Sequence, residues 1–96
     1  MITAEVSVVP VGVGTSVGRI VKSFIQLLRK SGLKVIVGPA STAVEARNTK
    51  ELFEIIDKAH NQLFDGSTVK RLITTIKIDD RRDKNSTLEY KLKAIQ

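Results

Sequence analysis

The chain has 96 residues, and its 16 Lys or Arg against 10 Asp or Glu give it a formal net charge of +6. This length predicts a single domain, residues 1–96, too small to bury both faces of a sheet generously, and the absence of cysteine excludes disulfides and cysteine-ligated metal centres. The chain has no basic leader and no apolar run long enough to span a bilayer, so we expect a cytoplasmic protein with no membrane partner.

Residues 1–10 predict a strand, because apolar side chains alternate with mostly polar ones. The next segment, residues 12–18, is rich in glycine. It departs from the dinucleotide-binding pattern G-x-G-x-x-G because its third glycine falls one place late and no parallel βαβ unit follows. Glycines that let a loop turn into a helix explain it, while the Ser16 hydroxyl and the free amides of that helix remain a candidate polar contact for a ligand.

A first helix follows this loop, with Thr15 or Ser16 as the expected N-cap and Gly32 as the stop. Its apolar stripe comprises Val17, Ile20, Val21, Phe24, Leu27 and Leu28. Two short segments, residues 33–37 and 41–47, flank a Gly-Pro turn and predict two strands in a hairpin.

A second helix is predicted to start at a capping-box-like pair, Asn48 and Glu51, and to end near Gly66. Its apolar face comprises Leu52, Ile55, Ile56, Ala59 and Leu63. Residues 69–79 alternate as a long strand. The charged extension, residues 83–96, is expected to form a short helix through Ala94. Asn85 or Ser86 would cap it, and Leu88, Leu92 and Ile95 form a stripe too small to stand alone, so this helix must dock on the domain or on a neighbour.

The order β-α-β-β-α-β predicts an α+β, ferredoxin-like fold: an antiparallel sheet with two helices on one face, and a short C-terminal extension. The other face would carry mixed charges and a few apolar groups. Exposed apolar side chains there favour packing on a second sheet over a fully solvated face. By parity its residues are Thr3, Glu5, Ser7, Lys34, Ile36, Glu45, Arg47, Arg71, Ile73, Thr75 and Lys77.

Neither an enzyme nor a nucleic-acid binder is indicated. The single histidine, His60, lies beside the apolar stripe of the second helix, far in sequence from any obvious nucleophile, and Asp79 and Asp80 adjoin two arginines, which favours ion pairs. Basic residues are spread along the chain rather than clustered. The few aromatic rings fall largely in helical patterns, which argues against a stacking platform for bases.

Glu45 is the most interesting polar residue, because alanine and valine flank it in a short strand with Thr42 close by. A carboxylate in a partly apolar pocket can accept a hydrogen bond from a protonated ring nitrogen and offset the charge of a cationic ligand. A cross-strand salt bridge to Lys77, Lys34 or Arg71 explains it equally well. The residues alone leave both interpretations open.

Three motifs resemble one known family: SGL at residues 31–33, PASTAVEA at 39–46 and IKIDDRR at 76–82. Together they are similar to the YkoF-related thiamine-binding family over nearly the whole chain. The resemblance implies a ferredoxin-like subunit, sheets packed face to face in dimers that often assemble into homotetramers, and binding of thiamine or its hydroxymethylpyrimidine part near the subunit interface. It implies no catalytic activity. We expect neither a cofactor nor a metal.

Carried over by position, Thr42 and Glu45 match the family's T-x-x-E centre, Ser16 matches the serine that opens its first helix, and Lys77 lies in its terminal strand. The chain departs where the family commonly has Met-Gly (Ala40 and Ser41), glycine (Ala46) and an aromatic residue (Ile36). These changes would weaken stacking on a pyrimidine and narrow the pocket.

The prediction is a non-enzymatic small-molecule-binding homo-oligomer. Its alternative is a structural or regulatory homo-oligomer without a functional pocket. The predicted ligand-binding residues are Ser7, Ser16, Thr42, Glu45 and Lys77.

Overall fold

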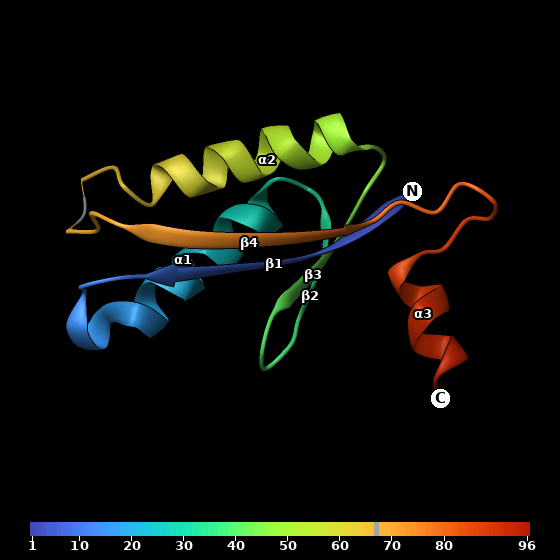
Figure 1. Cartoon of the computed structure of the whole chain (residues 1–96), viewed down its shortest axis with the longest axis horizontal. Coiled ribbons are helices and arrows are strands. Elements are labelled where there is room, and N and C mark those ends of the chain that lie inside the picture. Colours follow the sequence, from blue (N-terminus) through green and yellow to red (C-terminus); the bar gives the residue numbers. More distant parts are fainter. Residues whose placement is uncertain (67) are drawn as a thin grey trace.

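The computed structural model describes residues 1–66 and 68–96. Within these described residues, four strands and three α-helices follow one another, and a 3-10 turn, Gly14–Ser16, precedes the first helix (Figure 1). The elements are β1 (Ile2–Pro10), α1 (Val17–Lys30), β2 (Lys34–Val37), β3 (Thr42–Ala46), α2 (Thr49–Gln62), β4 (Leu72–Asp79) and α3 (Leu88–Ala94). This order confirms the predicted β-α-β-β-α-β core followed by a short terminal helix.

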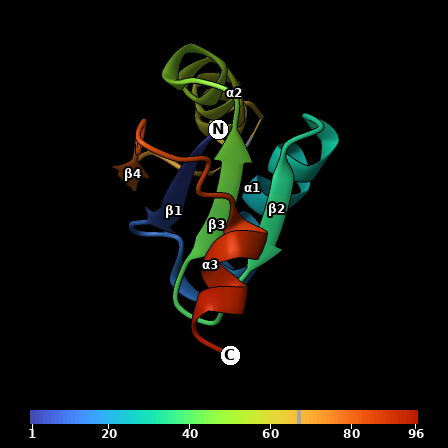
Figure 2. The same cartoon turned by 90° about the vertical axis from the view of Figure 1, so that its right-hand side faces the viewer.

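The strands form one antiparallel sheet in the order β2-β3-β1-β4. Helices α1 and α2 pack on the same face of this sheet, as Figures 1 and 2 show. We call that face the inner face and the opposite one the outer face. The fold class predicted from the sequence is therefore confirmed, and the strands β2 and β4 form the two edges of the sheet.

The core lies between the inner face and the two helices. Phe24 and Leu28 from α1, Leu52 from α2, Val6 from β1 and Val44 from β3 are its largest fully buried side chains. Each comes from the apolar face that the sequence periodicity assigns to its element. Burial of these side chains removes apolar surface from water, which is the main favourable term in folding.

The helix caps differ in detail from the predictions. Ser16 occupies the N-cap position of α1, but its side chain makes no capping hydrogen bond. At α2, Asn48 Oδ1 accepts from the Glu51 N–H at 2.8 Å, as predicted. The Glu51 carboxylate reaches one residue further back than in a capping box and accepts from the Arg47 N–H at 3.0 Å. One arm of the expected box is thus present, and the other is displaced.

The last two elements also correct the sequence interpretation. Strand β4 starts at Leu72, three residues later than expected. The N-cap of α3 is Thr87, not Asn85 or Ser86, and its hydroxyl oxygen accepts from the Tyr90 N–H at 3.1 Å. The helix docks on its own domain, since Leu88 is 7% exposed.

In the part of the chain that the structure describes, no helix is long and apolar enough to cross a membrane.

Candidate functional site

The outer face is organised as two rows of side chains that cross all four strands. The strand register places the residues of each row opposite one another. The first row is Lys34, Glu45, Thr3 and Asp79, and the second row is Ile36, Ala43, Glu5 and Lys77. Each row therefore combines opposite charges, and the second row also contains two apolar side chains.

Helix α3 lies against the first row and contacts Glu45 and Asp79. Figure 2 shows the helix beside β3. The Leu88 N–H donates to Glu45 Oε1 at 2.8 Å, and Lys91 forms an ion pair with Asp79. These two contacts fix the helix to β3 and to β4. Thr3, between them on β1, is only 4% exposed although it lies on the outer face. One end of the outer face is thus buried by the chain's own C-terminal helix.

The contact with Glu45 has a simple cause. The first amides of a helix have no carbonyl partner within the helix, and the N-terminus carries a partial positive charge. A carboxylate that reaches the Leu88 amide satisfies one such donor, while the Thr87 hydroxyl satisfies the amide of Tyr90. Glu45 therefore acts as a long-range cap of α3.

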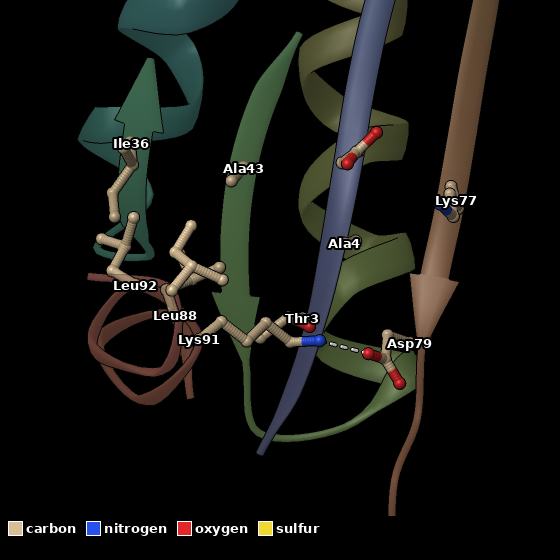
Figure 3. A pocket seen from close by; sticks show the side chains of 11 residues that line it. Thr3, Ala4, Ile36, Ala43, Lys77, Asp79, Leu88, Lys91 and Leu92 are labelled. Atoms are coloured by element: carbon tan, nitrogen blue, oxygen red, sulfur yellow. Dashed lines mark hydrogen bonds and ion pairs between the residues drawn. The ribbon is translucent and has the colours of Figure 1, made fainter. Parts of the chain in front are cut away.

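A cavity of about 270 Å³ lies between the second row and α3. Leu88 and Leu92 face Ile36 on its apolar side, and Lys91 reaches past Thr3 toward Asp79 (Figure 3). Glu5 and Lys77, cross-strand neighbours on β1 and β4, supply further polar groups. Small-molecule pockets usually enclose about 300–1,000 Å³, so this cavity is just below the usual size and open to solvent on one side.

The structure brings only some of the predicted site residues together. Glu45 and Lys77 lie on the outer face in neighbouring rows, and Ser7 lies on the same face, half-buried opposite Thr75. Lys77 lines the cavity. From the sequence, Glu45 could bind a ligand or form a cross-strand salt bridge. Among the described residues, no lysine or arginine forms an ion pair with it. Its carboxylate accepts instead from the Leu88 N–H.

Thr42 and Ser16 do not join this group. Thr42 is buried and alternates with Glu45 along β3, so the two side chains point to opposite faces of the sheet. Ser16 precedes α1, which follows the end of β1 remote from α3 (Figure 1). The expectation that these side chains converge on one ligand is not supported by this arrangement.

Sequence reasoning placed α3 on the domain or on a neighbour but missed its role as a wall of the cavity. The available signal was the stripe of Leu88 and Leu92. The surface on which these leucines pack could not be predicted, because it forms only when four separate strands pair in register. Ile95, the third member of that stripe, lies at the rim of the cavity and is 82% exposed.

The remaining polar candidates have structural partners. His60 Nδ1 lies 2.7 Å from Thr74 Oγ1, which ties α2 to β4. After β4, Arg82 pairs with Asp80 and Arg81 with Asp83, so the expected ion-pair cluster is confirmed. These arginines hold the pKa of each aspartate below its ordinary value, chiefly through side-chain hydrogen bonds. Over residues 1–66 and 68–96, no three His, Asp or Glu side chains are placed to hold a metal ion.

A ferredoxin-like sheet with two helices on one face and an open cavity on the other places the chain in a class of small α+β proteins. The comparison with known families is specific: residues 4–96 match the family model described as thiamine-binding protein. The chain belongs to this family, as its motifs predicted.

The sequence can be aligned with those of related proteins over nearly their full length. The chain is 38% identical over 94 residues to a UPF0045 protein of Methanocaldococcus jannaschii, covering 98% of this chain and 91% of that protein. A crystal structure of that protein superposes with a TM-score of 0.87, covering 98% and 94% of the two chains. A UPF0045 protein of Methanothermobacter thermautotrophicus is 34% identical over 97 residues, covering 100% and 97%.

A third similar structure comes from Thermotoga maritima, from a protein with a suggested role in thiamine biosynthesis or salvage. Its TM-score is 0.85 at 23% identity, covering 99% of this chain and 98% of that one. At this identity the likeness shows the common fold alone.

Proposed function

We propose that this protein is a non-enzymatic binder of thiamine or its hydroxymethylpyrimidine part, and that the ligand occupies the cavity between the second row and α3. The observation that carries the proposal is the pairing of the Glu5 carboxylate with the apolar wall of Ile36, Leu88 and Leu92 around one cavity. Membership of the thiamine-binding protein family supports the same ligand class.

The chemistry of the cavity suits an aminopyrimidine joined to a cationic ring. Glu5 accepts from an exocyclic amine or offsets the ring charge, and Lys77 donates to a pyrimidine nitrogen. The leucines of α3 cover the apolar face of the heterocycle. Glu45 acts on the site indirectly, because its contact with the Leu88 N–H holds α3 as a wall of the cavity. This proposal retains Glu45 and Lys77 from the sequence prediction and adds Glu5.

The size of the cavity supports a binding site that two subunits form together. At about 270 Å³ it holds a single heterocycle poorly shielded from water, and face-to-face packing of two outer faces would enclose it. We therefore propose that the site lies near the interface of a homo-oligomer. The cytoplasmic location stays a prediction from the sequence. Ser7 lies further along the outer face, where such a partner would meet it.

Titration calorimetry with thiamine and with hydroxymethylpyrimidine tests the proposal. Wild-type protein should bind at least one of them, and Glu5→Gln should weaken binding by about tenfold or more, the loss of one charge-assisted hydrogen bond. Glu54→Gln is the matched control, because it makes the same charge change on α2, on the other side of the sheet. Absence of heat with both ligands, or equal affinities for the two variants, would contradict the assignment.

A structural oligomer without a ligand is the second candidate. It is favoured by Val9 and Ile73, which pair across β1 and β4 on the outer face and are 50% and 48% exposed. These side chains lie beyond the region that α3 covers, so burying them needs a partner. Ile73→Ser should then weaken self-association measured by sedimentation, with no ligand present. If wild-type protein associates and also binds neither ligand, this second function replaces the first.

A further inference from the structure

A polar hollow of about 580 Å³ lies at the end of the sheet where β4 stops. Its walls come from the start of α2 and from the connector, residues 80–87, that joins β4 to α3. Figure 1 shows both segments at the same end of the molecule. The hollow shares no lining residue with the cavity beside α3, so it is a second, separate candidate for a binding site.

Cationic side chains dominate the lining of this hollow, which we call the basic hollow. Arg47 contributes from the turn between β3 and α2, and Arg81, Arg82 and Lys84 contribute from the connector. One carboxylate, that of Asp80, stands against them in the lining. The fold thus gathers basic residues that are spread along the sequence, and such a concave positive surface raises the local concentration of anions.

Each arginine of the basic hollow is bound by one carboxylate, in every case through its Nε and Nη2 atoms. The pairs are Arg47 with Glu51, Arg81 with Asp83, and Arg82 with Asp80. A guanidinium has five N–H donors, so each arginine keeps donors for a further anion. Over the described residues, no hydrogen bond or ion pair engages the Nη1 group of these arginines. Because the carboxylates already hold the guanidinium groups in place, less side-chain freedom is lost when an anion binds.

We propose that the basic hollow binds the phosphate group of a small phosphorylated molecule, either a phosphate ester or a diphosphate. The three guanidinium groups and the Lys84 ammonium supply the donors. The site requires neither the ligand proposed for the cavity beside α3 nor a second copy of the chain. Its test therefore stands or fails separately from the proposed function.

The chemistry and the size of the basic hollow both suit a phosphate. Paired N–H groups of arginine match the oxygens of a phosphate, and several arginines can meet one tetrahedral anion from different sides. The N-terminus of α2 borders the same hollow and adds a partial positive charge. Small-molecule sites usually enclose about 300–1,000 Å³, so the hollow has room for a second phosphate or for part of the molecule that carries the first. The guanidinium groups are exposed, which predicts a modest, salt-sensitive affinity.

Lys84 connects the basic hollow to α3. Its ammonium donates to the Tyr90 hydroxyl and lies 4.5 Å from the centre of the Tyr90 ring. A bound phosphate competes for this ammonium, because a dianion attracts it more strongly than a neutral hydroxyl does. Tyr90 is the only tyrosine and the chain has no tryptophan, so its fluorescence should report occupancy of the hollow.

Titration calorimetry with pyrophosphate and with inorganic phosphate, at low ionic strength, tests the site on the full-length protein. Wild-type protein should bind pyrophosphate saturably and more tightly than inorganic phosphate, since pyrophosphate brings more charge to the same donors. Arg81→Gln combined with Arg82→Gln should weaken pyrophosphate binding by about tenfold or more. Arg71→Gln makes the same type of charge change at the other end of β4 and is the matched control, which should bind like wild type.

Arg47→Gln tests the other wall of the hollow and should also weaken binding several-fold. Circular dichroism should match that of wild type, because the Arg47 side chain is exposed. Tyr90 fluorescence should change with the dissociation constant that calorimetry gives. Absence of pyrophosphate binding, equal affinities for the double variant and the Arg71→Gln control, or unchanged Tyr90 fluorescence on binding would overturn the proposal. A single-stranded oligonucleotide that bound more tightly than pyrophosphate through the same arginines would overturn it too, because it would assign the surface to nucleic acid.

Discussion

The carboxylate of Glu45 accepts a hydrogen bond from the backbone N–H of Leu88, 43 residues further along the chain. This contact joins the centre of the sheet to the first turn of the C-terminal helix. The short helix makes few other contacts with the sheet, and the Lys91–Asp79 ion pair is partly exposed, so it contributes little alone. Glu45 thereby helps to hold α3 in place as a wall of the cavity.

Removing the Glu45 carboxylate should release α3. Glu45→Ala removes the acceptor, whereas Glu45→Gln keeps an oxygen at the same place, so the first should weaken docking by about 1 kcal/mol and the second by less. Tyr90 is the only tyrosine and the chain has no tryptophan, so its fluorescence reports on α3 directly. Glu54→Gln, a loss of one carboxylate charge on α2 and away from α3, is the control. Equal spectra for Glu45→Ala and the control would contradict this role.

Truncating the core should cost far more than truncating α3. Leu52 is fully buried, so Leu52→Ala should lower the free energy of unfolding by about 2–5 kcal/mol through lost burial and a residual cavity. Leu92→Ala makes the same chemical change at a side chain that is 43% exposed and should cost less than about 1 kcal/mol. Urea unfolding monitored by circular dichroism measures both. Similar midpoints for the two variants would count against the assigned core.

Two glycines should respond oppositely to alanine. A Cβ at Gly38 would lie 2.9 Å from the Ser41 carbonyl oxygen, which also accepts from the Gly38 N–H in the β2–β3 turn. Gly38→Ala should therefore destabilise by about 1–3 kcal/mol. Gly18 lies in α1 with open space around it, so Gly18→Ala should stabilise by roughly 0.5–1 kcal/mol. The difference in thermal midpoint between the two variants is the measurement, and the opposite order would refute the turn geometry.

The ionisation of Glu51 should contribute to the pH dependence of the protein's stability. The Arg47 N–H and then the Arg47 side chain donate to its carboxylate and hold its pKa below the ordinary value. A carboxylate whose pKa is lowered in the folded state stabilises above its unfolded pKa, about 4.3. That stabilisation is lost as the pH falls through the folded pKa. NMR titration of the Glu51 carboxyl should give a midpoint below that of an unfolded peptide, and Glu51→Gln should lose this part of the acid sensitivity. A midpoint at or above the peptide value would contradict the contact.

The regular elements were predictable because they depend on local periodicity. The spacing of Ile20, Phe24 and Leu28 gives one helical stripe, and the alternation from Ile2 to Val8 gives one buried strand face. Cap details were less predictable. Competing oxygens at Asn85, Ser86 and Thr87 lie within three residues, and only the path of the chain after β4 selects Thr87.

The site was predictable in part. Parity along single strands correctly places Glu5, Glu45 and Lys77 on the outer face. The prediction for Thr42 relied on its nearness to Glu45 in the sequence. The two residues are three positions apart on a strand, so their side chains point to opposite faces of the sheet.

The sequence by itself determined the order of elements, the inner core and the family, since these depend on patterns within single segments and on motifs. The tertiary structure decided what the outer face does. Only the register of four strands aligns the two rows, and only the docking of α3 buries Thr3 in the first row and makes the second row the floor of a cavity. The physical reason is that these contacts join residues far apart in the chain, such as Glu45 and Leu88, whose pairing no local pattern encodes.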